Sequence, residues 1–324
     1  MAKVTPIQTN FAGGEISPKL QGRVDLQKYG ASCKLLQNFI CFPQGGVTKR
    51  SGTRHVAECK NSTSTKRLIP FVFSTTQAYM LEFGDDYIRF FRNEGQIYSS
   101  GSTPYELSSP YGQEYLDGLS FTQSADILYI THPSFSPRKL TRTAHNAWSI
   151  TELDHLDGPY LDINVSDVTI TPQAASGTGK TLTASADLWV STDVGRLVRL
   201  KHSSTHGYAK ITAVTNATVA VATIINNFGG TGGTTDWKLG AWSNTSGWPS
   251  CVTFYQDRLF FGNSTTQPNT VWGSKSGDFE NFAASATDGV VADDNALVFT
   301  LATDRVNAIR WMYSGKQLQL GTSD

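Results

Sequence analysis

The sequence predicts a mainly β protein, with repeated short antiparallel sheets of the β-propeller type, an inserted small β-barrel and one N-terminal helix. Three observations support this fold class. The 324 residues include 29 Gly and many Thr, Ser and Asn, which favours short strands joined by turns. Four apolar segments along the chain resemble one another. Between the second and the third of them, the composition changes over residues 164–246.

Residues 1–60 are predicted to form an N-terminal arm that serves assembly. Within the arm, residues 25–39 are the one substantial helix that we expect. Asp25 is a suitable N-cap, and apolar residues then recur at spacings of three and four. Gly30 lies in the middle of this segment and weakens the helix. Gly-Gly pairs precede and follow the segment, and their freedom to adopt positive φ lets the arm bend sharply.

Propeller-like blades are predicted in residues 61–163 and again in residues 247–324. Each repeat has a polar or small residue, a run rich in Leu, Ile, Phe and Tyr, and then a turn. Repeats of about 40–50 residues are typical of propeller blades, and we expect the apolar strand to be the innermost strand of its blade. A β-sandwich is the alternative. The segments are TQAYMLEFGD (76–85), SADILYITHP (124–133), YQDRLFFGNS (255–264) and GKQLQLGTSD (315–324).

Residues 164–246 are predicted to form a separate small β-barrel inserted into the repeats. The segment contains no Glu and is rich in Thr, Ala, Gly and Asn. Three stretches in it, GRLVRLKH, GYAKITAVT and ATVAVATII, are typical of consecutive strands, with turns at SSTH and TN.

Charge and motifs argue against several classes of function. Lys+Arg and Asp+Glu are equal at 27 each, whereas a dedicated nucleic-acid binder normally has a basic excess. SGTGKT (176–181) has Ala174 in place of the first Gly of a phosphate-binding loop and no helical period after it, so we interpret it as a hairpin turn. HSSTH (202–206) lacks the Glu of a metalloprotease motif. We therefore expect no enzymatic activity, no cofactor and no metal site.

Cysteine, tryptophan and hydropathy patterns complete the sequence-based expectations. The four Cys form no CxxC pair, so we expect buried free thiols. No run of 18 apolar residues is present, which predicts no membrane span, and the first ten residues lack the apolar segment of a secretory signal. The tryptophans near predicted strands are expected to anchor the core: Trp237, Trp242, Trp248, Trp272 and Trp311.

The N-terminal stretch resembles a known family. NFAGGEISPKLQGRVDLQKY (10–29), followed by LLQNFICFPQGGVTKRSGTRHV (35–56), resembles the start of the tail nozzle proteins (tail tubular protein B type) of short-tailed bacteriophages and related prophages. Phe-Ala-Gly-Gly-Glu, Gly-Arg-x-Asp, Asn-Phe and Gly-Gly-x-x-x-Arg-x-Gly-Thr occur in order. Residues 125–142 and 247–282 resemble blade segments of the same family, so the resemblance covers nearly the whole chain. The inserted barrel is similar to the first catalytic-cysteine half-domain of ubiquitin-activating enzymes, but no Cys lies between residues 60 and 250.

This resemblance implies a structural role in a virion. Family members form a hexameric ring at the distal end of a short tail, below an adaptor ring, and the lumen retains the packaged genome and then conducts it into the host. The implied partners are further copies of the chain, an adaptor or gatekeeper ring and tail fibres or spikes, with transient non-specific contact to DNA in the lumen. The implied location is the virion tail, assembled in the host cytoplasm. A neutral chain suits a conduit, because many phosphate contacts would slow the passage of DNA.

The arm supplies the candidate subunit contacts. Glu15, Arg23 and Arg50 are expected to pair across a subunit boundary, where a charge pair adds specificity. Rings use heterologous contacts, and an arm beside a globular body is a natural source of such a patch. The full set of candidates is Phe11, Glu15, Arg23, Tyr29, Asn38, Arg50 and Arg54.

Two other functions and one question of length stay open. A propeller-bearing glycan depolymerase would need two facing carboxylates, and a non-catalytic glycan-binding tail protein would need none. Family members usually exceed 324 residues, and the last segment stops directly after an apolar strand. We therefore expect a truncated chain, the alternative being that an N-terminal strand completes the last blade.

Overall fold

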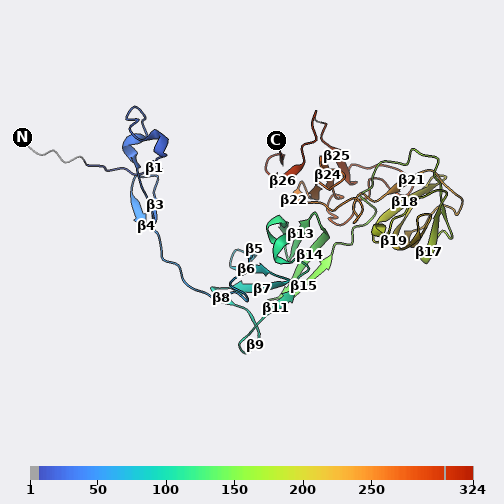
Figure 1. Cartoon of the computed structure of the whole chain (residues 1–324), viewed down its shortest axis with the longest axis horizontal. Coiled ribbons are helices and arrows are strands. Elements are labelled where there is room, and N and C mark those ends of the chain that lie inside the picture. Colours follow the sequence, from blue (N-terminus) through green and yellow to red (C-terminus); the bar gives the residue numbers. More distant parts are fainter. Residues whose placement is uncertain (1–6, 303, 324) are drawn as a thin grey trace, which may run out of the picture. The chain divides into compact units, whose positions relative to one another are not determined.

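The computed structural model describes residues 7–302 and 304–323 (Figure 1). It is 47% strand and 5% helix, which confirms a mainly β fold. The chain divides into two compact units, one reaching to Ala57 and the other starting at Glu58. In the described ranges every helix is a short 3₁₀ turn, and none of them is long and apolar enough to cross a membrane.

Four antiparallel meanders, in which consecutive strands lie side by side, make up much of the second unit. The first meander has β5 (Arg67–Ser74), β6 (Gln77–Gly84), β7 (Tyr87–Arg92) and β11 (Glu106–Ser108), with the short β8 (Gly95–Gln96) also paired to β7. The second has β12 (Ser120–Ser124), β13 (Ile127–His132), β14 (Phe135–Ala144) and β15 (Ala147–Glu152). The third has β22 (Cys251–Tyr255), β23 (Arg258–Gly262), β24 (Thr270–Gly273) and β25 (Leu297–Thr300). The fourth has β26 (Ile309–Ser314) and β27 (Leu318–Thr322).

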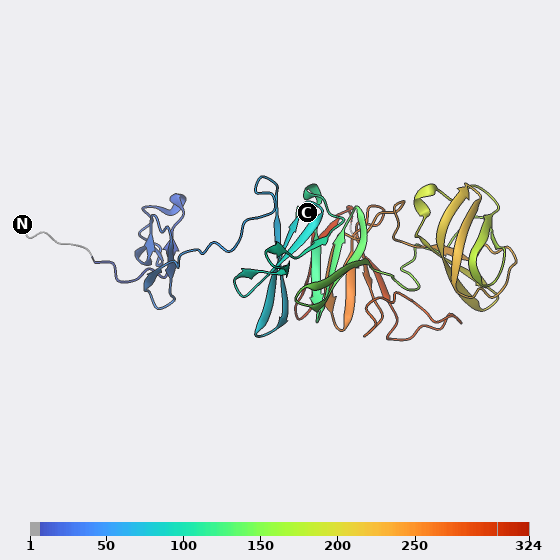
Figure 2. The same ribbon diagram turned by 90° about the horizontal axis from the view of Figure 1, so that it is seen from below.

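The meanders pack face to face in chain order (Figure 2). Strand β13 shows the arrangement, because its side chains alternate between two cores. Leu128 and Ile130 pack with the first meander, whereas Tyr129 packs with the third. Strand β23 repeats this pattern, with Phe261 facing the second meander and Phe260 facing the fourth. Each inner sheet is therefore covered on both faces.

The four apolar segments found in the sequence occupy equivalent places in this stack. They form β6, β13, β23 and β27, each the second strand of its meander. The prediction of an innermost strand was therefore wrong in position. In the two inner meanders the second strand has a neighbour on each side and a core on each face, which explains its apolar run. The first strand is less apolar, as the half-buried sequence SFTQS of β12 illustrates.

A six-stranded sheet with its own core interrupts the stack between β15 and β22. Its strand order is β16-β17-β20-β19-β18-β21, and it curls into a half-barrel. Backbone hydrogen bonds of 2.9 and 3.1 Å between Ile170 and Thr234 join β16, at one edge, to the segment that precedes β21, at the other. Three consecutive strands were predicted here, and β18 to β20 confirm them. The strands are β16 (Ile170–Pro172), β17 (Gly177–Ala184), β18 (Leu197–His202), β19 (Thr205–Asn216), β20 (Val219–Asn226) and β21 (Trp237–Leu239).

SGTGKT forms a strand and not the predicted hairpin turn. Gly177 opens β17, and the register of its pairing with β20 shifts between Gly177 and Lys180. Gly177 and Gly179 have φ of 109° and 63°, so this bulge uses a backbone conformation that glycine adopts without strain. Lys180 therefore lies beside a bulge of β17, opposite Ala222 of β20.

The predicted helix over residues 25–39 is absent. Its place is taken by a 3₁₀ turn, η2 (Tyr29–Ala31), and by β2 (Ser32–Cys33). The carboxylate of Asp25 does not cap a helix but accepts two hydrogen bonds from Arg23, at 2.6 and 2.8 Å. An isolated helix of this length is marginal in water, and Gly30 weakens it further. Pairing of β2 with the strand at Gly14 prevails over the local period.

The remaining elements are short, and several of them pair into two-stranded sheets. The arm has β1 (Gly14–Glu15), β3 (Phe39–Cys41), β4 (Val47–Lys49) and η1 (Pro18–Leu20); elsewhere lie β9 (Tyr98–Ser100), β10 (Thr103–Pro104), η3 (Gln113–Gly118) and η4 (Ser191–Asp193).

Two expectations about individual side chains need correction. Four of the five singled-out tryptophans are buried as predicted, but Trp311 is 52% exposed on the outer face of the last meander. The four cysteines are free thiols, yet only Cys251 is buried and Cys59 is exposed. The predicted boundaries at residues 60, 163 and 246 stay predictions.

Candidate functional site

The N-terminal arm, residues 7–57, has a defined backbone but no apolar core. Strand β1 pairs in parallel with β2, and β3 forms an antiparallel hairpin with β4. Among these residues only Gly45 is buried. Its φ is +97°, and a Cβ there would lie 2.9 Å from Asn10 Oδ1, so the turn requires glycine. Backbone hydrogen bonds and close turns, and not side-chain burial, hold the arm together.

Large apolar side chains are exposed along the arm. Val24 is 78% exposed and Leu35 63%. Burying one such side chain completely contributes roughly 1.5–3 kcal/mol. Contiguous exposed apolar surface on a soluble protein is typical of contact sites. The exposed set is Ile7, Leu20, Val24, Leu35, Phe39, Ile40, Phe42 and Val56.

Three of the predicted contact residues have partners within the arm. The backbone N–H of Phe11 donates to the Gly45 carbonyl over 2.8 Å. Glu15 Oε2 accepts a hydrogen bond of 2.9 Å from the Leu36 N–H. Arg23 is paired with Asp25, and both side chains are more than half exposed. Glu15 and Arg23 thus each interact with a different local partner, and they do not pair with each other within this chain.

The other four predicted residues lie on turns and at the end of the hairpin. The Tyr29 hydroxyl accepts from the Gly22 N–H over 3.3 Å. Asn38 has φ of 61°, and its carbonyl accepts from the Arg50 N–H over 2.8 Å. The residues Asn38, Arg50 and Arg54 are exposed. Asn38 and Arg50 therefore meet through their backbones and leave their side chains outward.

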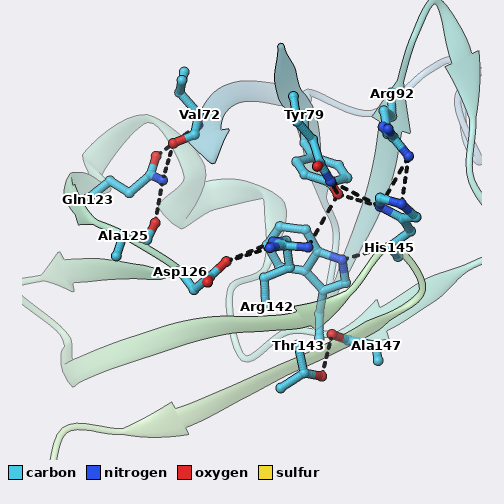
Figure 3. Close-up of polar contacts among 12 residues, drawn as sticks. Val72, Tyr79, Arg92, Gln123, Ala125, Asp126, Arg142, Thr143, His145 and Ala147 are labelled. Atoms are coloured by element: carbon cyan, nitrogen blue, oxygen red, sulfur yellow. Dashed lines mark hydrogen bonds and ion pairs between the residues drawn. The ribbon is translucent and has the colours of Figure 1, made fainter. Parts of the chain in front are cut away.

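A second cluster, which the sequence did not reveal, joins the first and second meanders (Figure 3). Arg92 Nη1 donates to Nε2 of His145 over 2.6 Å, and the Tyr79 hydroxyl contacts Nδ1 of the same ring. Arg142 pairs with Asp126 at 2.8 Å and lies over the Phe73 ring. Desolvation and the two neighbouring guanidinium groups lower the pKa of His145.

This cluster links the sheets of the first and second meanders. Tyr79 and Arg92 come from the first meander, whereas Asp126, Arg142 and His145 come from the second. Arg92 donates to the imidazole, which requires an unprotonated Nε2. These contacts hold the first two meanders against each other. Among the described residues, no group of three or more His, Cys, Asp or Glu could hold a metal ion.

A polar cavity of about 710 Å³ lies where the first strands of the four meanders begin. Arg67 opens β5, and its Nη1 donates to the carbonyls of Leu116, Asp117 and Leu119 at 2.6–3.1 Å. Arg310 of β26 also lines the cavity and is exposed. The lining has one carboxylate, that of Asp117.

Comparisons with known proteins identify no relative of this chain. No protein-family model matches it, and a search of curated proteins finds no match. The function must therefore be argued from its own residues.

Proposed function

We propose that the chain is a structural subunit of a short phage tail, forming a hexameric nozzle ring that retains the viral genome and then conducts it into the host. The observation that carries this proposal is the arm. It has an ordered backbone, several exposed apolar side chains and no core of its own. Such a segment gains most of its stabilisation by packing on another surface.

The body suits the role of a rigid ring segment. Its meanders share cores in chain order, and this continuous packing supports the proposal of a propeller-like arc. The net charge is zero, which fits a lumen through which DNA must pass without being held. The proposed partners are neighbouring copies, an adaptor or gatekeeper ring and tail fibres or spikes, within a tail assembled in the host cytoplasm.

Deleting residues 1–24 should leave the second unit folded and prevent incorporation into tails. The deletion removes β1, the partner of β2, and Val24, the arm's second most exposed large apolar side chain after Ile7. Thermal unfolding of residues 58–324 should stay unchanged, because the second unit has its own cores. Incorporation is measured by complementing a phage that lacks the gene and probing purified particles.

A matched pair of substitutions sharpens this test. Phe39→Asp places a charge on the exposed hairpin of the arm, whereas Val194→Asp makes the same kind of change at an exposed site of the half-barrel. We expect Phe39→Asp to block incorporation and Val194→Asp to permit it. Normal incorporation of both the deletion and Phe39→Asp would refute the assembly role of the arm.

The second candidate is a glycan-binding or glycan-cleaving tail protein, and the cavity at Arg67 and Arg310 is the observation that favours it. Its polar lining suits sugar hydroxyls, although a hydrolase would need a second carboxylate beside Asp117. Release of reducing ends from host surface glycan by the purified protein would support this candidate over the nozzle.

A further inference from the structure

Three neighbouring strands of the half-barrel place basic side chains on one face. In β18, Val198 and Leu200 point into the core, so Arg199 and Lys201 point to the opposite face. Arg199 lies directly opposite Lys238 of β21, and Lys201 directly opposite His206 of β19. Residues paired across antiparallel strands share a face. Arg199, Lys201, His206 and Lys238 therefore lie together outside the core.

The connection between β24 and β25, residues 274–296, covers this face and is called the strap here. Arg199 Nη2 donates to Ser285 Oγ over 2.8 Å, and the His206 N–H donates to the Thr287 carbonyl over 2.7 Å. Between strap and strands lies a cavity of about 280 Å³, the strap cavity. Its lining includes Arg199, Lys201, His206, Lys238 and Ser285, together with one carboxylate, that of Asp236.

The charges in the strap cavity do not balance. Asp157 lies 3.9 Å from Arg199, and Asp236 lies 3.2 Å from Lys201. In the described part of the chain, Lys238 has no carboxylate within ion-pair distance. The three cations Arg199, Lys201 and Lys238 thus have two neighbouring carboxylates, those of Asp157 and Asp236. Burial, together with Arg199 and Lys201, lowers the pKa of His206, while Asp236 and Asp157 oppose that shift.

We propose that the strap cavity binds a phosphate group, held by the ammonium groups of Lys201 and Lys238 and by the imidazole of His206. Lysine and imidazolium nitrogens donate charge-assisted hydrogen bonds, which are the strong kind that oxyanions accept. Arg199 keeps its Nη2 on the strap and adds positive potential. The volume suits a phosphate alone or one carried on a small sugar, since pockets for larger ligands start at about 300 Å³. This binding activity goes beyond the assembly role.

The direct test is a pH titration of the His206 ring by NMR, with His206→Gln used to assign its signal. Inorganic phosphate is added to the intact protein, and chloride at matched ionic strength is the control. We expect phosphate to raise the pKa of His206 in a saturable way, because a bound dianion favours the protonated ring. An unchanged titration in phosphate would overturn the proposal. The titration itself is recorded on the unaltered protein, and His206→Gln serves only to assign the signal.

A pair of lysine variants then tests the assigned residues. Lys238→Gln should weaken phosphate binding about tenfold, which is the loss of one charge-assisted hydrogen bond. Lys180→Gln, on β17 of the same half-barrel and outside the cavity lining, should leave binding unchanged. Equal effects of the two variants would contradict the assignment. Glucose 6-phosphate, compared with glucose and with free phosphate, distinguishes a phosphosugar from inorganic phosphate as the preferred ligand.

Discussion

Replacing Arg258 with methionine is expected to lower the free energy of unfolding of the second unit by at least about 3 kcal/mol. Arg258 is 8% exposed and opens β23. Its guanidinium donates to the carbonyls of Ser274 and Asn295 at 2.7 and 2.6 Å, and to those of Asp293 and Asp294 at 2.8 and 3.2 Å. Methionine replaces the aliphatic stem of arginine but has no donor, so the buried carbonyls of Ser274 and Asn295, at the two ends of the strap, lose their partners.

Arg310→Met is the matched control for this measurement. Arg310 lies in the neighbouring strand β26 with an exposed side chain, so its replacement should change stability by no more than about 0.5 kcal/mol. Both variants are compared by urea unfolding, and an unchanged m-value would show that the same surface unfolds. Equal small losses would mean that the strap is held by other contacts.

Acid is expected to destabilise the second unit by about 3 kcal/mol through His155 alone. Burial lowers the pKa of His155 from 6.5 to about 4, the ring lying beside Trp242. The folded protein therefore binds fewer protons than the unfolded chain between these two values. The stabilisation is complete above pH 6.5 and is lost progressively as the pH falls to about 4.

The measurement compares the unfolding free energy of the parent protein and His155→Gln at pH 7 and pH 4. Glutamine stays neutral, so the gap between the two proteins should shift by about 3 kcal/mol in favour of the variant at pH 4. His132, His145 and His206 also have lowered pKa values but are present in both proteins, so their contribution cancels. His55→Gln, an exposed site, is the control for loss of an imidazole. A gap that does not depend on pH would contradict the account of His155.

The repeated strands were predictable because their burial is two-sided. In the inner sheets, β13 and β23 each have a core on both faces, so each contains an uninterrupted apolar run, Ile127–Ile130 in β13 and Leu259–Phe261 in β23, which is conspicuous in the sequence. Strands β16 and β17 escaped prediction because Thr, Gly and Pro dominate them, and only one face meets the half-barrel core. Sequence patterns thus identify the covered strands better than the edge strands.

The prediction of a helix in the arm was wrong because the arm has no core against which a helix could pack. A period of three or four predicts a helix only where an apolar face has something to pack against, and residues 7–57 bury no apolar side chain. The segment took short strands and turns fixed by backbone hydrogen bonds, with Glu15 capping the Leu36 N–H. The spacing of apolar residues in a segment does not tell whether the folded chain offers a core for that segment.

The polar clusters could not be predicted from the sequence because their residues come from segments that are far apart along the chain. Gln77 and His145, 68 residues apart, meet in the cluster that links the first two meanders. Lys139 and Glu280 pair across 141 residues. The arm candidates came from a short motif, and their side chains are exposed or committed to local partners, so the structure of one chain leaves their intersubunit role as a proposal.

Electron microscopy of the purified intact chain tests the central claim most directly. The nozzle account predicts sixfold rings with a central hole, in which density of the arm continues onto a neighbouring body. The same images of the chain lacking residues 1–24 should show separate bodies of the size of the second unit. Isolated particles of the intact chain, or rings that persist unchanged without the arm, would contradict the account.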